Sequence, residues 1–225
     1  INGRFGLKCG DEILKQFSMC MQSCINENQK IYELGNGRFI IMDLANHSKE
    51  DILELYDELK KSVEVALEEN VYRVVYTISV GIVEIDKEMK DYDTLIKYSD
   101  FALNEAKKKG KNSCYFFTQD KYKQFIRRRE IRVELQNAVD HNFKNFDVYY
   151  QPIIDIHTRN LIGAEALMRF KMKRNEQIEF ISPAEFIPIL EESGLIIPAG
   201  RWILRQAVAC CKKWQEFIPE FKVNV

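Results

Sequence analysis

The sequence has almost no net charge, because 33 Lys and Arg residues are balanced by 34 Asp and Glu residues to give a formal charge of −1. A general nucleic-acid-binding protein needs a surplus of Lys and Arg to neutralise phosphates. We therefore expect no DNA or RNA partner. The sequence also lacks any apolar run close to the roughly 18 to 20 residues that span a membrane. These domains are expected in the cytoplasm, and a membrane anchor upstream is left open.

Cysteine pairs of the C-x-x-C type and clusters of histidine are absent as well. The six cysteines are Cys9, Cys20, Cys24, Cys114, Cys210 and Cys211. Cys20 and Cys24 lie one helical turn apart, which a metal could use, but without further ligands nearby this spacing favours a reduced pair in the core. Cys210 and Cys211 are adjacent, and adjacent cysteines rarely form a disulfide. The three histidines are isolated, so the sequence predicts no metal or catalytic cluster built on them. The absence of a disulfide pattern among the cysteines predicts a reducing compartment.

Apolar residues, in contrast, make up 46% of the sequence and can supply an ordinary globular core. In the first half they recur at helical spacing, and one long run is rich in the β-branched residues that favour strands. Ser48 is placed to cap one helix and Gly110 to end another. The first half is predicted to hold helices over Gly10–Asn26, from Ser48 through Val63, over Tyr92–Lys109 and over Thr118–His141, and strands over Lys30–Leu34, Arg38–Asp43, Val71–Ile85 and Ser113–Phe117.

The stretch LGNGRFIIM, from Leu34 to Met42, is typical of a β-hairpin. Asn36 and Gly37 tolerate the positive φ angles that a two-residue turn requires. The most prominent polar side chain at this turn is Arg38.

The second half repeats the alternation of strands and helices. A polar cluster, His157–Asn160, interrupts two apolar strands and predicts a turn. Ser182 and Pro183 are typical of a helix start, with proline in the first turn. The second half is predicted to hold strands over Asp147–Ile156 and Leu161–Phe170, helices over Ser182–Ser193 and Pro198–Phe217, and a strand that starts at Phe221.

Four stretches of the first half occur in an order typical of one family. They are INGRFGLKCGDEIL, YELGNGRFIIMDL, TISVGI and SDFALNEAKKKGKN. Together they resemble the GGDEF domain of diguanylate cyclases over residues 1–118, without that family's first strand and first helix. The resemblance implies an α+β domain whose active members condense two GTP molecules into cyclic di-GMP with the help of a divalent metal.

The hairpin departs from that family at the residues that carry the chemistry. Active members have acidic groups where this chain has Gly37 and Arg38, and a metal bound to phosphates needs anionic oxygens nearby. A guanidinium in that place repels the cation. The family's upstream inhibitory Arg-x-x-Asp is also missing, because Asn26 and Gln29 stand there. We therefore expect no cyclase activity and a regulatory role for this half.

Binding of GTP without turnover is left open. By the resemblance, Asn2 and Asp11 occupy positions that hydrogen-bond guanine, and Lys107 occupies one that approaches phosphate. The alternative is that Asp11 caps a helix and that Lys107 is an ordinary solvated lysine.

The second half holds the most specific stretches, VYYQPIIDIHTRNLIGAEALMRF and ISPAEFIPILEESGLI. They resemble the start of an EAL phosphodiesterase domain, whose known members are (β/α)₈-type barrels that hydrolyse cyclic di-GMP to a linear dinucleotide with two metal ions. The expected fold is therefore α/β. We expect a partial GGDEF domain at 1–118, a helical linker at 119–134 and the N-terminal part of an EAL barrel at 135–225.

Side chains alternate across a strand, which places Gly163, Glu165, Leu167 and Arg169 on one face and apolar residues on the other. A carboxylate and a guanidinium on the inner face of a barrel strand are costly unless they pair or bind a ligand. The spacing alone does not separate a ligand site from a buried Glu–Arg ion pair. The resemblance favours the site, with Glu165 projecting into a cavity to hold Mg²⁺ or Mn²⁺ and Arg169 binding a phosphate oxygen.

Three further roles come from the resemblance alone. Gln151 and Leu167 correspond to contacts with cyclic di-GMP, and Asn224 corresponds to a metal ligand. A complete barrel needs about 250 residues, and the family's later acidic ligands and catalytic lysine would lie beyond Val225. We expect this chain alone to be inactive and the intact protein to be a metal-dependent phosphodiesterase.

The sequence therefore predicts a cyclic di-GMP signalling protein in which an inactive GGDEF domain, and a sensory domain expected upstream, control an EAL-type phosphodiesterase. One alternative is a catalytically silent module that binds cyclic di-GMP or GTP, and another is a purely structural or partner-binding role. The helix through Arg127–Arg129 is either a transmitter between the halves or a solvated linker. A homodimer is left open.

Overall fold

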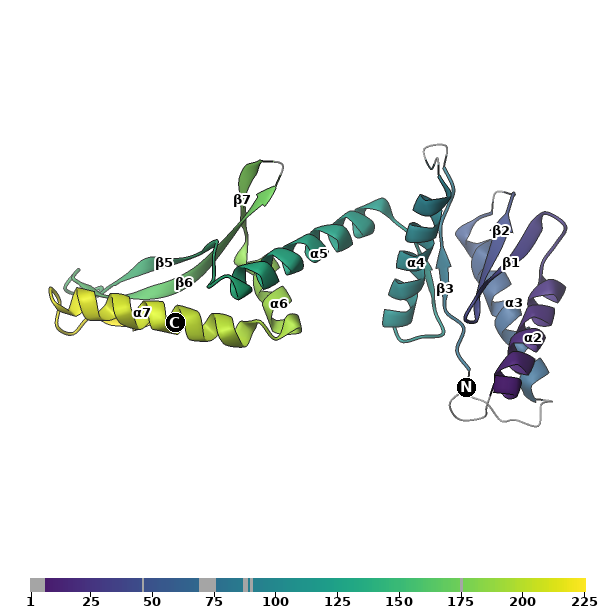
Figure 1. Ribbon diagram of the computed structural model, residues 1–225, viewed down its shortest axis with the longest axis horizontal. Helices are drawn as coiled ribbons and strands as arrows, with labels where there is room; N and C mark the ends of the chain where they lie inside the picture. The colour runs from purple at the N-terminus through teal and green to yellow at the C-terminus, as the bar shows by residue number, and fades with distance from the viewer. Residues whose placement is uncertain (1–6, 46, 69–75, 87–88, 90, 175) are drawn as a thin grey trace. The chain divides into compact units, whose positions relative to one another are not determined.

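A computed structural model describes residues 7–45, 47–68, 76–86, 89, 91–174 and 176–225. The chain divides into two compact units, Ile1–Thr118 and Gln119–Val225 (Figure 1). The mixture of helices and strands in both confirms the expected α/β class. Of the helices that the structure describes, none combines the length and the apolar content of a membrane span.

Within the described residues, the first unit contains two separate two-stranded sheets with helices packed on them. Its elements are α2 (Leu7–Cys24), β1 (Gln29–Gly35), β2 (Arg38–Asp43), α3 (Lys49–Glu68), β3 (Val80–Ile82), α4 (Tyr92–Lys108) and β4 (Cys114–Phe116). Strands β1 and β2 are antiparallel, whereas β3 and β4 are parallel. Met21 of α2 and Val63 of α3 are each 2% exposed and share one core with Ile31 and Phe39 of the hairpin.

Local signals in the first unit are confirmed. Asn36 and Gly37 form the turn of the hairpin with φ angles of 55° and 68°, which is the pattern of a type I′ turn. Ser48 caps α3: the Asp51 N–H donates to Ser48 Oγ over 3.1 Å, and the Ser48 N–H donates to Asp51 Oδ2 over 2.8 Å. This reciprocal pair is a capping box.

The strand predicted over Val71–Ile85 is wrong in its extent. Within the described residues only Val80–Ile82 forms a strand, and residues 69–75 lie outside them. The physical reason is that β3 pairs with β4 over three residues, so residues 76–79 and 83–85 have no ladder partner within the described part of the chain. Gly81 also brings β3 against α4, since a Cβ there would lie 2.3 Å from Leu103 N.

The second unit is one sheet with helices covering one of its faces. Its elements are α5 (Gln119–Asp140), β5 (Phe146–Ile154), β6 (Leu161–Arg174), β7 (Gln177–Ile181), α6 (Pro183–Ser193), α7 (Ile196–Gln215) and β8 (Lys222–Asn224). The strands run in the order β5–β6–β7 with antiparallel pairing, and β8 pairs with β6 in parallel. Neither β7 nor the extension of β6 beyond Phe170 was predicted from the sequence.

The predicted alternation along β6 is confirmed on its apolar side. Ala164, Ala166, Met168 and Phe170 are buried, at 1 to 8% exposure. Buried residues of α5, α6 and α7 pack on this side, and Figure 1 shows α7 running below β5 and β6. The exception is Ile162, which is 45% exposed near the start of the strand.

Ion pairs attach α5 to the rest of the second unit. Arg127 Nη1 lies 2.8 Å from Glu179 Oε1 on β7, and Arg127 also forms a two-pronged hydrogen bond with Glu185 on α6, in which Nη2 donates to Oε2 over 3.0 Å. The hydrogen bond to Glu185 is the main cause that raises the pKa of Arg127 above its usual range. Arg128 pairs with Glu192 over 2.7 Å at a more exposed position. Whether α5 transmits a signal stays a prediction.

Replacing Arg127 by alanine is expected to lower the free energy of unfolding of the second unit by about 1–2 kcal/mol. The substitution leaves Glu179 and Glu185 without the cation that joins them. Urea unfolding followed by tryptophan fluorescence reports on this unit, because both tryptophans of the chain, Trp202 and Trp214, lie in it. Arg128→Ala is the matched control and should cost less than about 0.5 kcal/mol. Equal losses in the two variants would contradict the assignment.

Candidate functional site

The strand register brings three of the predicted site residues into one row. Gln151 on β5 lies opposite Glu165 on β6, and Glu165 lies opposite Asn224 on β8. Directly opposed residues of neighbouring strands project to the same face of a sheet. A carboxylate with an amide on each side, from segments far apart in the sequence, therefore forms one line across three strands.

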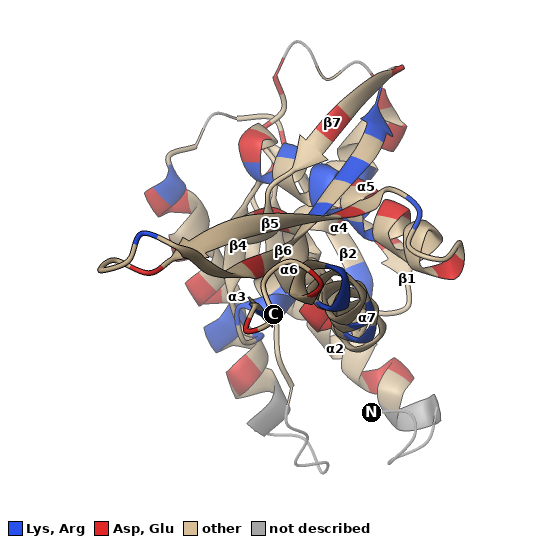
Figure 2. Ribbon diagram, turned by 90° about the vertical axis from the view of Figure 1, so that its left-hand side faces the viewer, with Lys and Arg blue, Asp and Glu red and all other residues tan. Residues whose placement is uncertain are grey.

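The other predicted residues follow on the same face. Tyr149 lies opposite Leu167, and Asp147 lies opposite Arg169. We name this side of the sheet the open face; it carries Asp147, Tyr149, Gln151, Glu165, Leu167, Arg169, Lys171 and Asn224. Toward β7 it becomes basic, and Figure 2 shows blue bands along the end of β6 beside that strand.

The expectation that Glu165 projects into a cavity is not met by the described residues, because the side chain is exposed to solvent. A buried Glu–Arg ion pair is not formed either: among these residues no salt bridge joins Glu165 to Arg169. Residues four apart on a strand are separated by roughly 13 Å, which is too far for such a pair. Glu165 is therefore available to a ligand.

Two residues that were not predicted as site residues contact Arg169, and an ion pair lies beside it. Its Nη1 donates to the Met168 carbonyl oxygen over 2.9 Å, and its Cζ lies 5.4 Å from the ring centroid of Tyr149. Asp147 forms an ion pair with Lys171, in which Nζ lies 2.8 Å from Oδ2. The alternation of VYYQP places Tyr149 on the same face as Gln151 and is the signal that could have identified it.

The donors in the row fit a hard divalent cation in part. Mg²⁺ and Mn²⁺ prefer carboxylate and amide oxygens, which Glu165 and Asn224 supply. No group of three His, Cys, Asp or Glu residues suited to a metal occurs in the part of the chain that the structure describes. These two residues therefore provide part of a coordination sphere.

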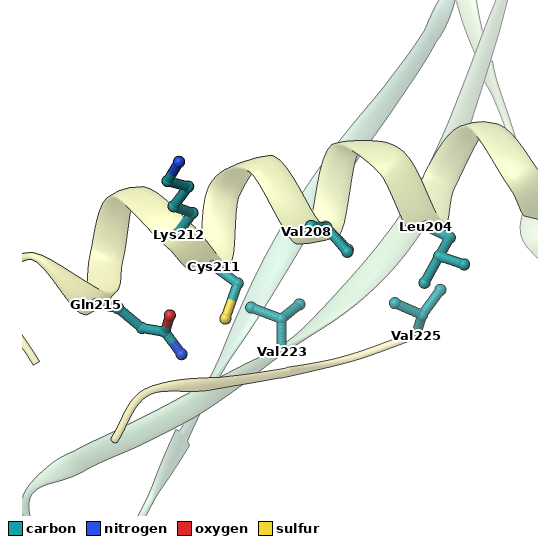
Figure 3. A pocket seen from close by; sticks show the side chains of 8 residues that line it. Leu204, Val208, Cys211, Lys212, Gln215, Val223 and Val225 are labelled. Carbon is teal, nitrogen blue, oxygen red and sulfur yellow. The ribbon is translucent and has the colours of Figure 1, made fainter. Parts of the chain in front are cut away.

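A separate pocket of about 360 Å³ lies between α7 and β8 (Figure 3). Val223 and Val225 point into it from β8 and the chain end, and Leu204, Val208 and Cys211 line it from α7. Because Val223 and Asn224 are neighbours on a strand, they project to opposite faces. The pocket therefore lies on the helix-covered side of the sheet and not on the open face.

In the first unit, the hairpin arginine is paired. Arg38 Nη1 lies 3.2 Å from Asp100 Oδ1 on α4, and both side chains are exposed. Asp11 lies within α2 and not at its N-cap, so the alternative role as a helix cap is wrong. Asp11 and Lys107 are both exposed, and Asn2 lies outside the described residues. The nucleotide contacts of these three residues stay predictions.

Comparisons with known proteins match both halves of the chain to family models. Residues 1–113 match the model described as "Diguanylate cyclase, GGDEF domain". Residues 132–225 match the model of the EAL domain.

Curated relatives match nearly the whole chain. It is 26% identical over 217 residues to the cyclic di-GMP phosphodiesterase PdeR of Escherichia coli, covering 96% of this chain and 32% of the relative. It is 24% identical over 214 residues to the bifunctional diguanylate cyclase/cyclic di-GMP phosphodiesterase MucR of Pseudomonas aeruginosa, covering 95% and 30%. The chain thus spans about a third or less of the length of these relatives.

A solved structure described as the active GGEEF domain of a diguanylate cyclase from Vibrio cholerae is similar to the first half. It is 27% identical, covers 53% of this chain and 75% of that chain, and has a TM-score of 0.44.

Proposed function

Because the chain belongs to the family of proteins that join a GGDEF domain to an EAL domain, we propose that the intact protein hydrolyses cyclic di-GMP to a linear dinucleotide. The row Gln151–Glu165–Asn224 on the open face carries this proposal. The row supplies an exposed carboxylate flanked by amides. Arg169, four residues after Glu165 on the same face of β6, adds a guanidinium.

The reaction adds water to a phosphorus atom and breaks one ester bond to a ribose oxygen. When bound by Glu165 and Asn224, Mg²⁺ or Mn²⁺ would lower the pKa of the attacking water and offset charge on the diester. Arg169 donates N–H groups to a phosphate oxygen, and Gln151 supplies an amide for a further hydrogen bond. Leu167, between them, offers an apolar contact.

In this proposal the GGDEF half is regulatory and inactive as a cyclase. Arg38 brings a positive charge to the hairpin where a carboxylate would hold a cation, and its ion pair with Asp100 uses a carboxylate of α4. The change from a carboxylate to a guanidinium alters the local charge by about two units and opposes metal binding at the hairpin.

Chelation of divalent metal is expected to abolish the hydrolysis of cyclic di-GMP by the intact protein. Chromatography of the linear dinucleotide should show product with Mg²⁺ or Mn²⁺, none with excess EDTA, and recovery when the metal is restored. The same assay with GTP in place of cyclic di-GMP should yield no cyclic product. Hydrolysis that is insensitive to EDTA, or absent with both metals, would refute the proposal.

A second candidate is a catalytically silent receptor for cyclic di-GMP or GTP. It requires contacts to the nucleotide but no complete metal site, and Arg169 and Gln151 on the open face are placed to supply such contacts. Calorimetry on the intact protein separates the two functions: a receptor binds cyclic di-GMP without product appearing. Absence of binding to either nucleotide would instead indicate a structural role.

A further inference from the structure

We propose that Tyr149 and the Lys171–Asp147 ion pair are positioning groups that keep the Arg169 guanidinium uncompensated and available to a phosphate anion. This inference rests on the proposed function, because the anion is the phosphodiester of cyclic di-GMP. It adds three residues to the site: Tyr149 orients Arg169, and Lys171 prevents Asp147 from neutralising it.

The first step concerns the carboxylate opposite Arg169. Asp147 is its cross-strand partner in the β5–β6 register, and directly opposed side chains of opposite charge ordinarily interact. Here Asp147 Oδ2 lies 2.8 Å from Lys171 Nζ instead. Among the described residues, the carboxylate best placed to neutralise Arg169 is therefore paired with another cation.

The second step concerns the groups that do contact Arg169. The Tyr149 ring and the Met168 carbonyl oxygen are both neutral, so they orient the guanidinium without reducing its formal charge. A cation over an aromatic face is held by the ring quadrupole, and a planar guanidinium also stacks on it. The carbonyl takes one N–H, and the guanidinium has five. The remaining donors are available for the oxygens of a phosphate.

Exposure allows this arrangement to receive a ligand. Tyr149 is 50% exposed on the open face, and the side chains of Asp147 and Lys171 are 41% and 33% exposed. Phosphate binds a guanidinium through paired N–H groups more strongly than a neutral acceptor does. The positive charge of Arg169 that attracts the diester is thus preserved, because Lys171 pairs with Asp147, the carboxylate that would otherwise neutralise it.

Binding of cyclic di-GMP to the intact protein tests the role of Lys171, with metal chelated so that the nucleotide is not consumed. Lys171→Met frees Asp147 to pair with Arg169 and should weaken binding by about 10-fold. Adding Asp147→Asn to that variant should restore the affinity to within about 2-fold of the unmodified protein, because the competing carboxylate is removed. A general loss of positive charge would not be rescued in this way.

Lys173→Met is the matched control. Lys173 lies on the same strand and face and pairs with Glu176, an ion pair more exposed than that of Lys171. Its substitution should change the affinity by less than about 2-fold. For the aromatic group, Tyr149→Ala should weaken binding by about 5-fold, whereas Tyr149→Phe keeps the ring and should match the unmodified protein. Tryptophan fluorescence of each variant confirms the fold.

Each outcome supports or overturns a named step. Equal weakening by Lys171→Met and Lys173→Met, or failure of Asp147→Asn to rescue, would overturn the role of the ion pair. Normal affinity in Tyr149→Ala would overturn the role of the ring. Binding by the unmodified protein without turnover in metal would refute hydrolysis and leave this inference intact. No binding by the unmodified protein with metal chelated would overturn this inference, and product formation in Mg²⁺ or Mn²⁺ would still decide the proposed hydrolysis.

Discussion

Glu165→Gln is expected to reduce the hydrolysis of cyclic di-GMP by the intact protein by more than about 100-fold in Mg²⁺ or Mn²⁺. Glutamine has nearly the same size and removes the negative charge from the row Gln151–Glu165–Asn224. Glu165 is exposed and makes no salt bridge within the described residues, so its replacement should not disturb the fold. A loss of turnover is then a loss of cation binding and not of stability.

The control for Glu165→Gln is the same substitution at Glu216, an exposed residue that follows α7 in the same unit. Its rate should equal that of the unmodified protein. Rates are compared by chromatography of the linear dinucleotide at saturating metal and again over a metal titration. If Glu165→Gln hydrolyses cyclic di-GMP as fast as Glu216→Gln, then Glu165 holds no metal and the proposed mechanism is wrong.

Features governed by neighbouring residues could be predicted from the sequence. The turn at Asn36 and Gly37 follows from the positive φ angles that these residues tolerate, and the cap at Ser48 follows from side-chain hydrogen bonds within one turn. The burial of alternate residues along β6 follows from the pleat of a strand. In each case the determining contacts span only a few positions.

Features that depend on distant partners could not be predicted in this way. Strand β7 contains charged and apolar residues in a short run, and Glu179 in it pairs with Arg127 on α5, far away in the sequence. Within the described residues, the expected strand around Val80 is limited to β3, which pairs with β4 over three residues. The Glu165–Arg169 ion pair, which was the alternative to a ligand site, is not formed because four residues along a strand rise by roughly 13 Å.

The candidate site also combines features that local sequence predicts with features that depend on distant partners. The resemblance identified Gln151, Glu165 and Asn224 separately, and the alternation predicted a common face for residues of one strand. Their alignment in one row required the register of β8 on β6, which joins residues 163–165 to residues 222–224. The environment of Arg169 likewise depends on which strand lies opposite. Register is a nonlocal property that a single strand pattern does not fix.

Gly163→Ala is expected to damage both stability and turnover, because this glycine sets the distance between β6 and β8. A Cβ at Gly163 would lie 2.5 Å from the backbone oxygen of Lys222. A backbone atom cannot move aside by changing rotamer, so β8 has to shift away from β6. Asn224, two residues after Lys222, would then lose its place beside Glu165.

We expect Gly163→Ala to lower the free energy of unfolding of the second unit by about 1–3 kcal/mol and to slow hydrolysis by the intact protein about 100-fold. Urea unfolding read by the fluorescence of Trp202 and Trp214 measures the first effect, and dinucleotide release below the unfolding transition measures the second. The activity loss should exceed what the unfolded fraction explains, because the displaced Asn224 affects folded molecules.

Gly200→Ala is the matched control for this substitution. Gly200 lies within α7, and a Cβ there would meet no atom within 4 Å apart from its chain neighbours and the backbone of its own helix. Alanine is a better helix former than glycine, so the control should be as stable as the unmodified chain or more stable by about 0.5–1 kcal/mol. Its turnover should be unchanged. If Gly163→Ala keeps full activity, close pairing of β8 with β6 is not needed for the reaction, and Asn224 is not a ligand.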